Sequence, residues 1–179
     1  MRLFLLVGLV WALASCSNSG GGGSSASNDP YAGEYFLVQN IQGGSYVHAL
    51  KIEGVNSFKG MTIFIPVSQT NLIYRKSVGT FTKNGNKYTV NYSYSTCGGT
   101  EPETFELSGD ASDVIGVKAE GNATSLVFRN SKKYVITGLN ENNIQSGTED
   151  KSCNLLSKYS GKSRTVASKK KSFIAEIAE

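Results

Sequence analysis

The sequence is poor in the residue types that build reactive centres, with one histidine and three cysteines among 179 residues. It also lacks Gly-x-Ser-x-Gly, the phosphate-binding loop and His-Glu-x-x-His, the short motifs of serine hydrolases, nucleotide-binding proteins and zinc proteases. The sequence therefore contains no recognisable reaction constellation. We predict no catalytic residues, no metal ligands and no cofactor, and we expect a protein that is not an enzyme.

The apolar run at residues 3–13 is too short to cross a membrane as a helix, which needs about 18 or more apolar residues. It follows the positive charge of Arg2 and precedes the small residues Ala14 and Ser15, which is the pattern of a secretory signal peptide. We therefore expect residues 1–15 to be a signal peptide that is removed.

The same run ends in Leu13-Ala14-Ser15-Cys16. This tetrapeptide resembles the lipobox of bacterial lipoproteins, in which a signal peptidase cuts before the cysteine and that cysteine receives the lipid. The resemblance implies that Cys16 is lipidated. Its acyl chains (palmitate, for example) would together attach the protein stably to the membrane, which is thus an expected partner. In that family a residue other than aspartate after the cysteine favours the outer membrane, and here it is Ser17. We expect a location in the cell envelope, periplasmic or surface-facing; the alternative is an ordinary signal peptide with a nearby cysteine.

Glycine and serine dominate residues 16–29, which contain no large apolar side chain. Such a segment behaves as a flexible coil with a span of about 20 Å, so we expect a tether between the lipid and a folded domain. That domain, predicted at residues 30–157, is close to neutral, because residues 17–157 hold eleven basic and twelve acidic side chains. The tail at 158–179 holds six basic and two acidic ones. A nucleic-acid-binding domain carries its basic surface on the fold, so we expect no nucleic acid partner.

With Cys16 assigned to the lipid, Cys97 and Cys153 remain. An exported protein enters an oxidising compartment, where an even number of cysteines predicts a disulfide, here Cys97–Cys153. The alternative makes Cys97 a nucleophile with His48 as its base, but nothing in the sequence brings His48 near it. Two cysteines and one histidine also fall short of the four close ligands of a structural zinc site.

Short β-favouring runs separated by turn residues fill the chain from Pro30 onward, and no helical period of apolar residues appears before Leu156. Turns are expected at Asn84-Gly85-Asn86, Gly121-Asn122 and Asn130-Ser131-Lys132, because these residues tolerate the positive φ of tight hairpins. Many short strands at regular spacing predict an all-β fold, either a single antiparallel barrel or a sandwich. The candidate strands are residues 35–41, 46–52, 61–67, 72–78, 80–83, 87–95, 104–107, 114–119, 125–129, 133–137 and 143–145.

The strand at 87–95 has the clearest alternation, which places Tyr88, Val90, Tyr92 and Tyr94 on one face. One interpretation is a tyrosine-lined cavity or stacking platform, with Tyr88, Tyr92 and Tyr94 as candidate ligand-binding residues. The other is a core or rim whose phenol groups reach water or a partner.

A second resemblance lies in Gly33-Glu34-Tyr35. It is similar to the Gly-x-Trp motif on the first strand of lipocalin-like barrels, in which the glycine eases a bend and the indole fills the barrel base. Tyrosine stands here in place of tryptophan. The resemblance implies a closed, lipocalin-like barrel that encloses a small ligand.

The tail at 158–179 is expected to form a short helix or to be disordered. In a helix beginning near Ser163, one side would carry the apolar residues of the tail, and a basic amphipathic helix can contact an anionic membrane surface. A frayed end is the alternative. The residues on that side are Val166, Lys170, Phe173, Ile174 and Ile177.

These patterns lead to the hypothesis of a cell-envelope lipoprotein whose non-enzymatic β-domain binds a small molecule or another envelope component. One alternative is an inhibitor of an envelope-acting enzyme, which predicts a protruding loop such as residues 98–102. Another is a small envelope hydrolase or isomerase. It requires Cys97, or a carboxylate pair such as Glu101 and Glu103, to converge with His48.

Overall fold

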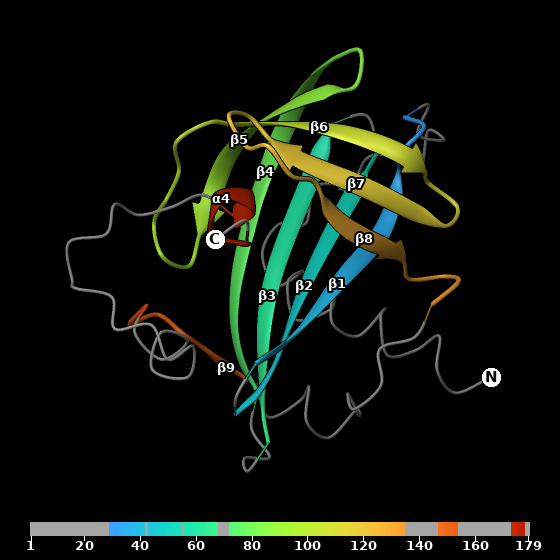
Figure 1. Cartoon of the computed structure of the whole chain (residues 1–179). Coiled ribbons are helices and arrows are strands. Elements are labelled where there is room, and N and C mark those ends of the chain that lie inside the picture. Colours follow the sequence, from blue (N-terminus) through green and yellow to red (C-terminus); the bar gives the residue numbers. More distant parts are fainter. Residues whose placement is uncertain are drawn as a thin grey trace.

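The computed structural model describes residues 29–41, 43–54, 56–67, 72–134, 147–153 and 173–177. Eight strands form a closed antiparallel barrel (Figure 1), in which each strand pairs with the next along the chain and β8 pairs with β1. The predicted all-β antiparallel barrel is therefore confirmed over the sandwich, while its lipocalin-like character stays a prediction. The strands are β1 (Gly33–Ile41), β2 (Gly44–Glu53), β3 (Ser57–Pro66), β4 (Ile73–Asn84), β5 (Lys87–Ser95), β6 (Glu103–Asp110), β7 (Val114–Ala119) and β8 (Leu126–Asn130), with a short β9 (Thr148–Glu149) paired parallel to the start of β4.

The predicted strands at 87–95 and 114–119 coincide with β5 and β7. The ranges predicted at 72–78 and 80–83 are in a strand almost throughout, but the break predicted between them is wrong, because β4 runs through Gly79. Lys133 lies in a turn rather than in the strand predicted at 133–137. Residues 135–137 and 143–145 lie outside the described residues.

Two of the predicted hairpin turns join neighbouring strands. Gly85 connects β4 to β5 with φ of 62°, and Gly121 connects β7 to β8 with φ of 83°. These are left-handed conformations that glycine adopts without steric cost. The third predicted turn also exists, because the Asn130 side chain accepts a hydrogen bond from the Lys132 amide at 2.8 Å. No strand follows it in the residues up to 134.

The barrel has two distinct ends, the Asp29 end and the disulfide end. The Asp29 end holds Asp29 and the turn between β4 and β5. The disulfide end holds Cys97, which follows β5, and Cys153, which follows β9; β9 is at the lower left of Figure 1 and the β4–β5 turn at the top. Strands β1 to β4 have nine to twelve residues, whereas β6 to β8 have eight, six and five. The wall is therefore shorter on the β6–β8 side.

An apolar core fills one part of the barrel interior, apart from a smaller cluster formed by Phe64 and Ile73. Inward-facing side chains of all eight strands contribute to it, as their alternation requires. The five-residue helix α4 (Phe173–Ile177) contributes three more, so the predicted β-domain at 30–157 omits part of the core. The core residues are Tyr35, Leu50, Ile52, Phe58, Phe81, Tyr88, Val90, Tyr92, Phe105, Leu107, Ile115, Val117, Ala119, Phe128, Phe173, Ile174 and Ile177.

Candidate functional site

Tyr88 and Tyr92, two of the three candidate ligand-binding tyrosines, are part of this core rather than lining an open space. The Tyr88 hydroxyl donates to the Asp29 carboxylate at 2.7 Å, and the Tyr92 hydroxyl donates to Glu103 Oε2 at 2.5 Å. Burial, and then the neighbouring carboxylate, raise the pKa of both phenols above the usual value. Both tyrosines are thus neutral hydrogen-bond donors whose rings are packed.

Tyr94 is on the opposite face from the other two. The pairing of β4 with β5 shifts between Val78 and Gly79, so that Ser93 is an extra residue with no counterpart in the β4 register. Such a β-bulge reverses the alternation that follows it, because two residues on one strand face one on the other. Tyr94 therefore points outward and is 40% exposed. Its hydroxyl donates to Glu149 Oε1 at 2.6 Å, and Lys76 Nζ lies 5.4 Å from its ring centroid.

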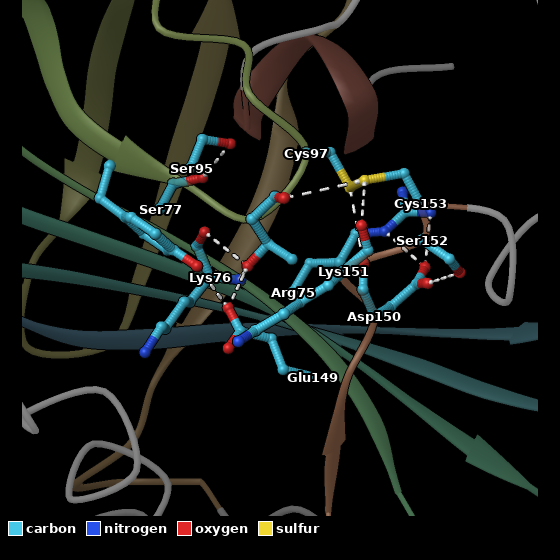
Figure 2. Close-up of a disulfide and its surroundings, with 12 residues drawn as sticks. Arg75, Lys76, Ser77, Ser95, Cys97, Glu149, Asp150, Lys151, Ser152 and Cys153 are labelled. Atoms are coloured by element: carbon cyan, nitrogen blue, oxygen red, sulfur yellow. Dashed lines mark hydrogen bonds and ion pairs between the residues drawn. A yellow bond between two sulfur atoms is a disulfide. The ribbon is translucent and has the colours of Figure 1, made fainter.

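The predicted disulfide joins Cys97 and Cys153, whose Cα atoms are 5.6 Å apart (Figure 2). It links the end of β5 to the segment after β9. Backbone hydrogen bonds reinforce the link: the Thr148 amide donates to Leu72 O at 2.7 Å and the Asp150 amide to Tyr74 O at 2.8 Å. The sulfur of Cys97 is consequently not a thiol in this structure.

A buried ion pair lies on the inner side of the same junction. Arg75 donates to Asp150 Oδ2 through Nε at 3.0 Å and through Nη2 at 2.8 Å, and the Asp150 side chain is 0% exposed (Figure 2). Asp150 Oδ1 accepts from the Ser152 hydroxyl at 2.9 Å. Sequence reasoning missed this pair, because 75 residues separate the partners and neither residue type is usually buried.

His48 is inside the barrel and only 4% exposed. Its Nδ1 is 3.1 Å from the Thr62 hydroxyl and its Nε2 is 3.2 Å from Gln39 Oε1. With the Gln39 oxygen as acceptor, Nε2 carries the proton and Nδ1 accepts from Thr62. Burial lowers the pKa of His48 to about 4, so the ring is neutral at physiological pH. Among the described residues, no hydrogen bond joins His48 to Cys97 or to a carboxylate, so the arrangement required by the hydrolase hypothesis does not form there.

Glu103, which lies where β6 begins, is a buried acidic residue and is 7% exposed. Besides the Tyr92 hydroxyl, its Oε2 accepts from the Ile174 backbone amide at 3.0 Å. Phe173 of the same helix packs edge-on against Phe58, with ring centroids 6.1 Å apart. The sequence showed that Phe173, Ile174 and Ile177 could share a face, but not that this face meets the barrel interior.

Asp29, at the end of the predicted tether, belongs to the folded barrel. In addition to Tyr88, its carboxylate accepts from the Tyr31 amide at 2.8 Å and lies 3.3 Å from Lys83 Nζ. Tyr35, the last residue of Gly33-Glu34-Tyr35, is buried nearby, and its hydroxyl donates to Tyr31 O at 3.0 Å. Burial raises the pKa of Tyr35 to about 12. Contacts with Tyr88, Tyr31 and Lys83 thus hold Asp29 against the barrel at the start of the described chain.

The lipidation candidate Cys16 lies outside the described residues. Within the ranges that the structure describes, no helix has the length and apolar character to cross a membrane. In those ranges no three His, Cys, Asp or Glu side chains come together in a way that would hold a metal ion. Comparison with protein-family models, curated proteins and solved structures finds no match for this chain.

Proposed function

We propose that this chain is a lipid-anchored protein of the cell envelope and that its barrel is a non-enzymatic binding domain. The lipobox-like tetrapeptide ending at Cys16 and the glycine-rich segment after it support the anchor. Cys97 was the candidate nucleophile and His48 the candidate base, and neither is available for catalysis in this structure. Cys97 is in a disulfide, and both ring nitrogens of His48 are hydrogen-bonded, to Thr62 and Gln39, which supports a binding role. These engaged groups are the observation that favours binding over the hydrolase or isomerase alternative.

The fixed position of Asp29 supports an orientation for this domain. A lipid on Cys16 would be joined to the barrel by a tether of about 20 Å that ends at Asp29. The Asp29 end would then face the bilayer, and the disulfide end, with Tyr94 on its outer wall, would face away. We infer that the barrel presents its disulfide end to the envelope component that it binds.

The anchor is tested by cell fractionation and by mass spectrometry of the extracted protein. Cys16→Ser should move the protein out of the membrane fraction and abolish the mass of the acylated N-terminus. Cys97→Ser is the matched control, since it also removes one cysteine but should remain acylated and membrane-bound. An unacylated wild-type chain that keeps residues 1–15 would contradict the proposal.

The orientation is tested with a photoreactive amino acid placed at either end of the barrel in living cells. A photoreactive group at Tyr94 should form adducts with an envelope protein, whereas one at the exposed Lys83, near Asp29, should react with lipid. Protein adducts from position 83 alone would reverse the orientation.

Inhibition of an envelope-acting enzyme is a second candidate, favoured by the loop at residues 98–102. Four of its five residues are exposed, and Cys97 fixes its base through the disulfide. A rigid exposed loop loses little entropy when a partner binds it. Replacing residues 100–102 by glycine should abolish inhibition of the partner enzyme while leaving the barrel folded.

A further inference from the structure

We propose that the space filled by α4 is a binding site for an apolar peptide segment of an envelope protein, and that α4 is its built-in competitor. The proposal rests on the binding role proposed above and names the ligand class and the site. α4 has five residues, of which Phe173, Ile174 and Ile177 are buried in the barrel core.

The barrel provides a niche for an aromatic ring at the position of Phe173. A Cβ added to Gly60 would lie 2.7 Å from ring atoms of Phe173, closer than carbon atoms approach one another. The ring can therefore occupy its place only because residue 60 of β3 is glycine. Phe58, two residues earlier on the same strand, offers its ring edge-on to Phe173.

The barrel also provides a polar anchor beside this niche. Glu103 Oε2 accepts from the Ile174 backbone amide at 3.0 Å, while the Tyr92 hydroxyl donates to the same oxygen. A charge-assisted hydrogen bond to a backbone amide is strong in a buried setting and requires no particular side chain. The site would thus recognise an aromatic side chain followed by a backbone N–H group. Only the aromatic residue restricts the peptide sequence, because almost every residue supplies the N–H group.

The conformation of α4 depends on the barrel. Isolated helices shorter than about 12 residues are marginal in water, so five residues do not form a helix without the surface that they bind. This coupling of folding and binding is typical of a peptide ligand. The 19 residues from 154 to 172 join α4 to the segment that carries Cys153. Because α4 belongs to the same chain as the barrel, a peptide from another protein must compete with an intramolecular ligand.

The test measures binding of a fluorescein-labelled peptide with the sequence of residues 169–179 to the purified full chain. The wild type should bind it poorly, because α4 occupies the site. The variant Phe173→Ala/Ile177→Ala should bind it at least ten-fold more tightly. Val127→Ala is the matched control, an exposed apolar truncation on β8 that should behave like the wild type.

Two further changes examine the niche itself. Adding Gly60→Ala to the Phe173→Ala/Ile177→Ala chain should weaken peptide binding at least ten-fold. A peptide in which alanine replaces the phenylalanine should fail to bind that chain. The proposal is overturned if the folded double variant binds no better than the wild type, or if Gly60→Ala leaves its affinity unchanged. Neither result depends on the lipid anchor, so failure here is distinguishable from failure of the proposed function.

A second measurement keeps the wild-type interior and does not rely on a variant that folds poorly. The full chain carries 4-fluorophenylalanine at position 173, and its ¹⁹F resonance reports whether the ring is buried. Millimolar unlabelled peptide should convert the buried resonance progressively into a solvent-exposed one. A resonance that does not change under those conditions would identify α4 as a permanent part of the core and end the proposal.

Discussion

His48 should make the stability of the barrel depend on pH between the pKa of the residue in the unfolded chain and its lower pKa in the folded chain. In the folded chain burial holds the pKa of His48 at about 4, against 6.5 for the exposed residue. Between pH 6.5 and pH 4, His48 therefore binds a proton in the unfolded chain but not in the folded chain. Stability rises with pH wherever the unfolded state binds more protons, so this contribution is complete above pH 6.5 and is lost as the pH falls toward 4.

The size of the effect follows from the same two values. Each tenfold difference in proton affinity corresponds to about 1.4 kcal/mol, so the full loss on acidification is about 3 kcal/mol. Between pH 7 and pH 5 the expected loss is about 2 kcal/mol. With a urea dependence of about 2 kcal/mol per molar, the unfolding midpoint should fall by about 1 M.

Urea unfolding at pH 7, 6, 5 and 4, followed by circular dichroism, measures this loss. His48→Asn is the reference, since asparagine does not titrate in this range. Carboxylates titrate in both proteins, so their contributions cancel when the two pH profiles are subtracted. If the wild type and His48→Asn lose the same free energy between pH 7 and pH 5, burial does not suppress the charge of His48 and the reasoning is wrong.

Three other predictions concern the junctions of the barrel. Cys97→Ser opens a disulfide spanning 56 residues and should lower the unfolding free energy by about 4 kcal/mol, measured by urea unfolding without reductant. Arg75→Met removes two donors from the buried Asp150 carboxylate and should cost about 3 kcal/mol, whereas Arg75→Met/Asp150→Leu should cost less; thermal melts compare the two. Tyr88→Phe deletes the hydrogen bond to Asp29 and should cost about 1–2 kcal/mol, with faster amide exchange at Tyr31 as the local readout.

Local patterns predicted the barrel strands well because alternation is a local property. β5 and β7 match their predicted bounds, and β3 ends at Pro66, since proline cannot donate to a further ladder bond. Gly79 was taken as a break, but the structure uses it for close packing. A Cβ at Gly79 would lie 2.4 Å from the Asn91 carbonyl oxygen, so the glycine lets the strands stay paired beside the bulge.

The orientation of Tyr94 was not predictable in the same way. The sequence of β5 alternates without interruption, and the extra residue Ser93 is revealed only by its register against β4. The sequence therefore assigned one tyrosine too many to the inward face of β5. Glu103 and Phe173 illustrate a second limit: their partners lie 71 and 113 residues away, at the Ile174 amide and Gly60, and no local period carries that information.

The hydrogen bond between Tyr88 and Asp29 also determines how the barrel responds to a mechanical load. A pull on the chain ahead of Asp29 first strains that hydrogen bond and the contact with Lys83, and then acts along β1. β1 is paired with β2 over its whole length, and a force parallel to that ladder loads all of its hydrogen bonds together instead of peeling them one at a time. The barrel should thus resist a pull on its N-terminal side as a rigid body, and the hydrogen bond between Tyr88 and Asp29 should break first.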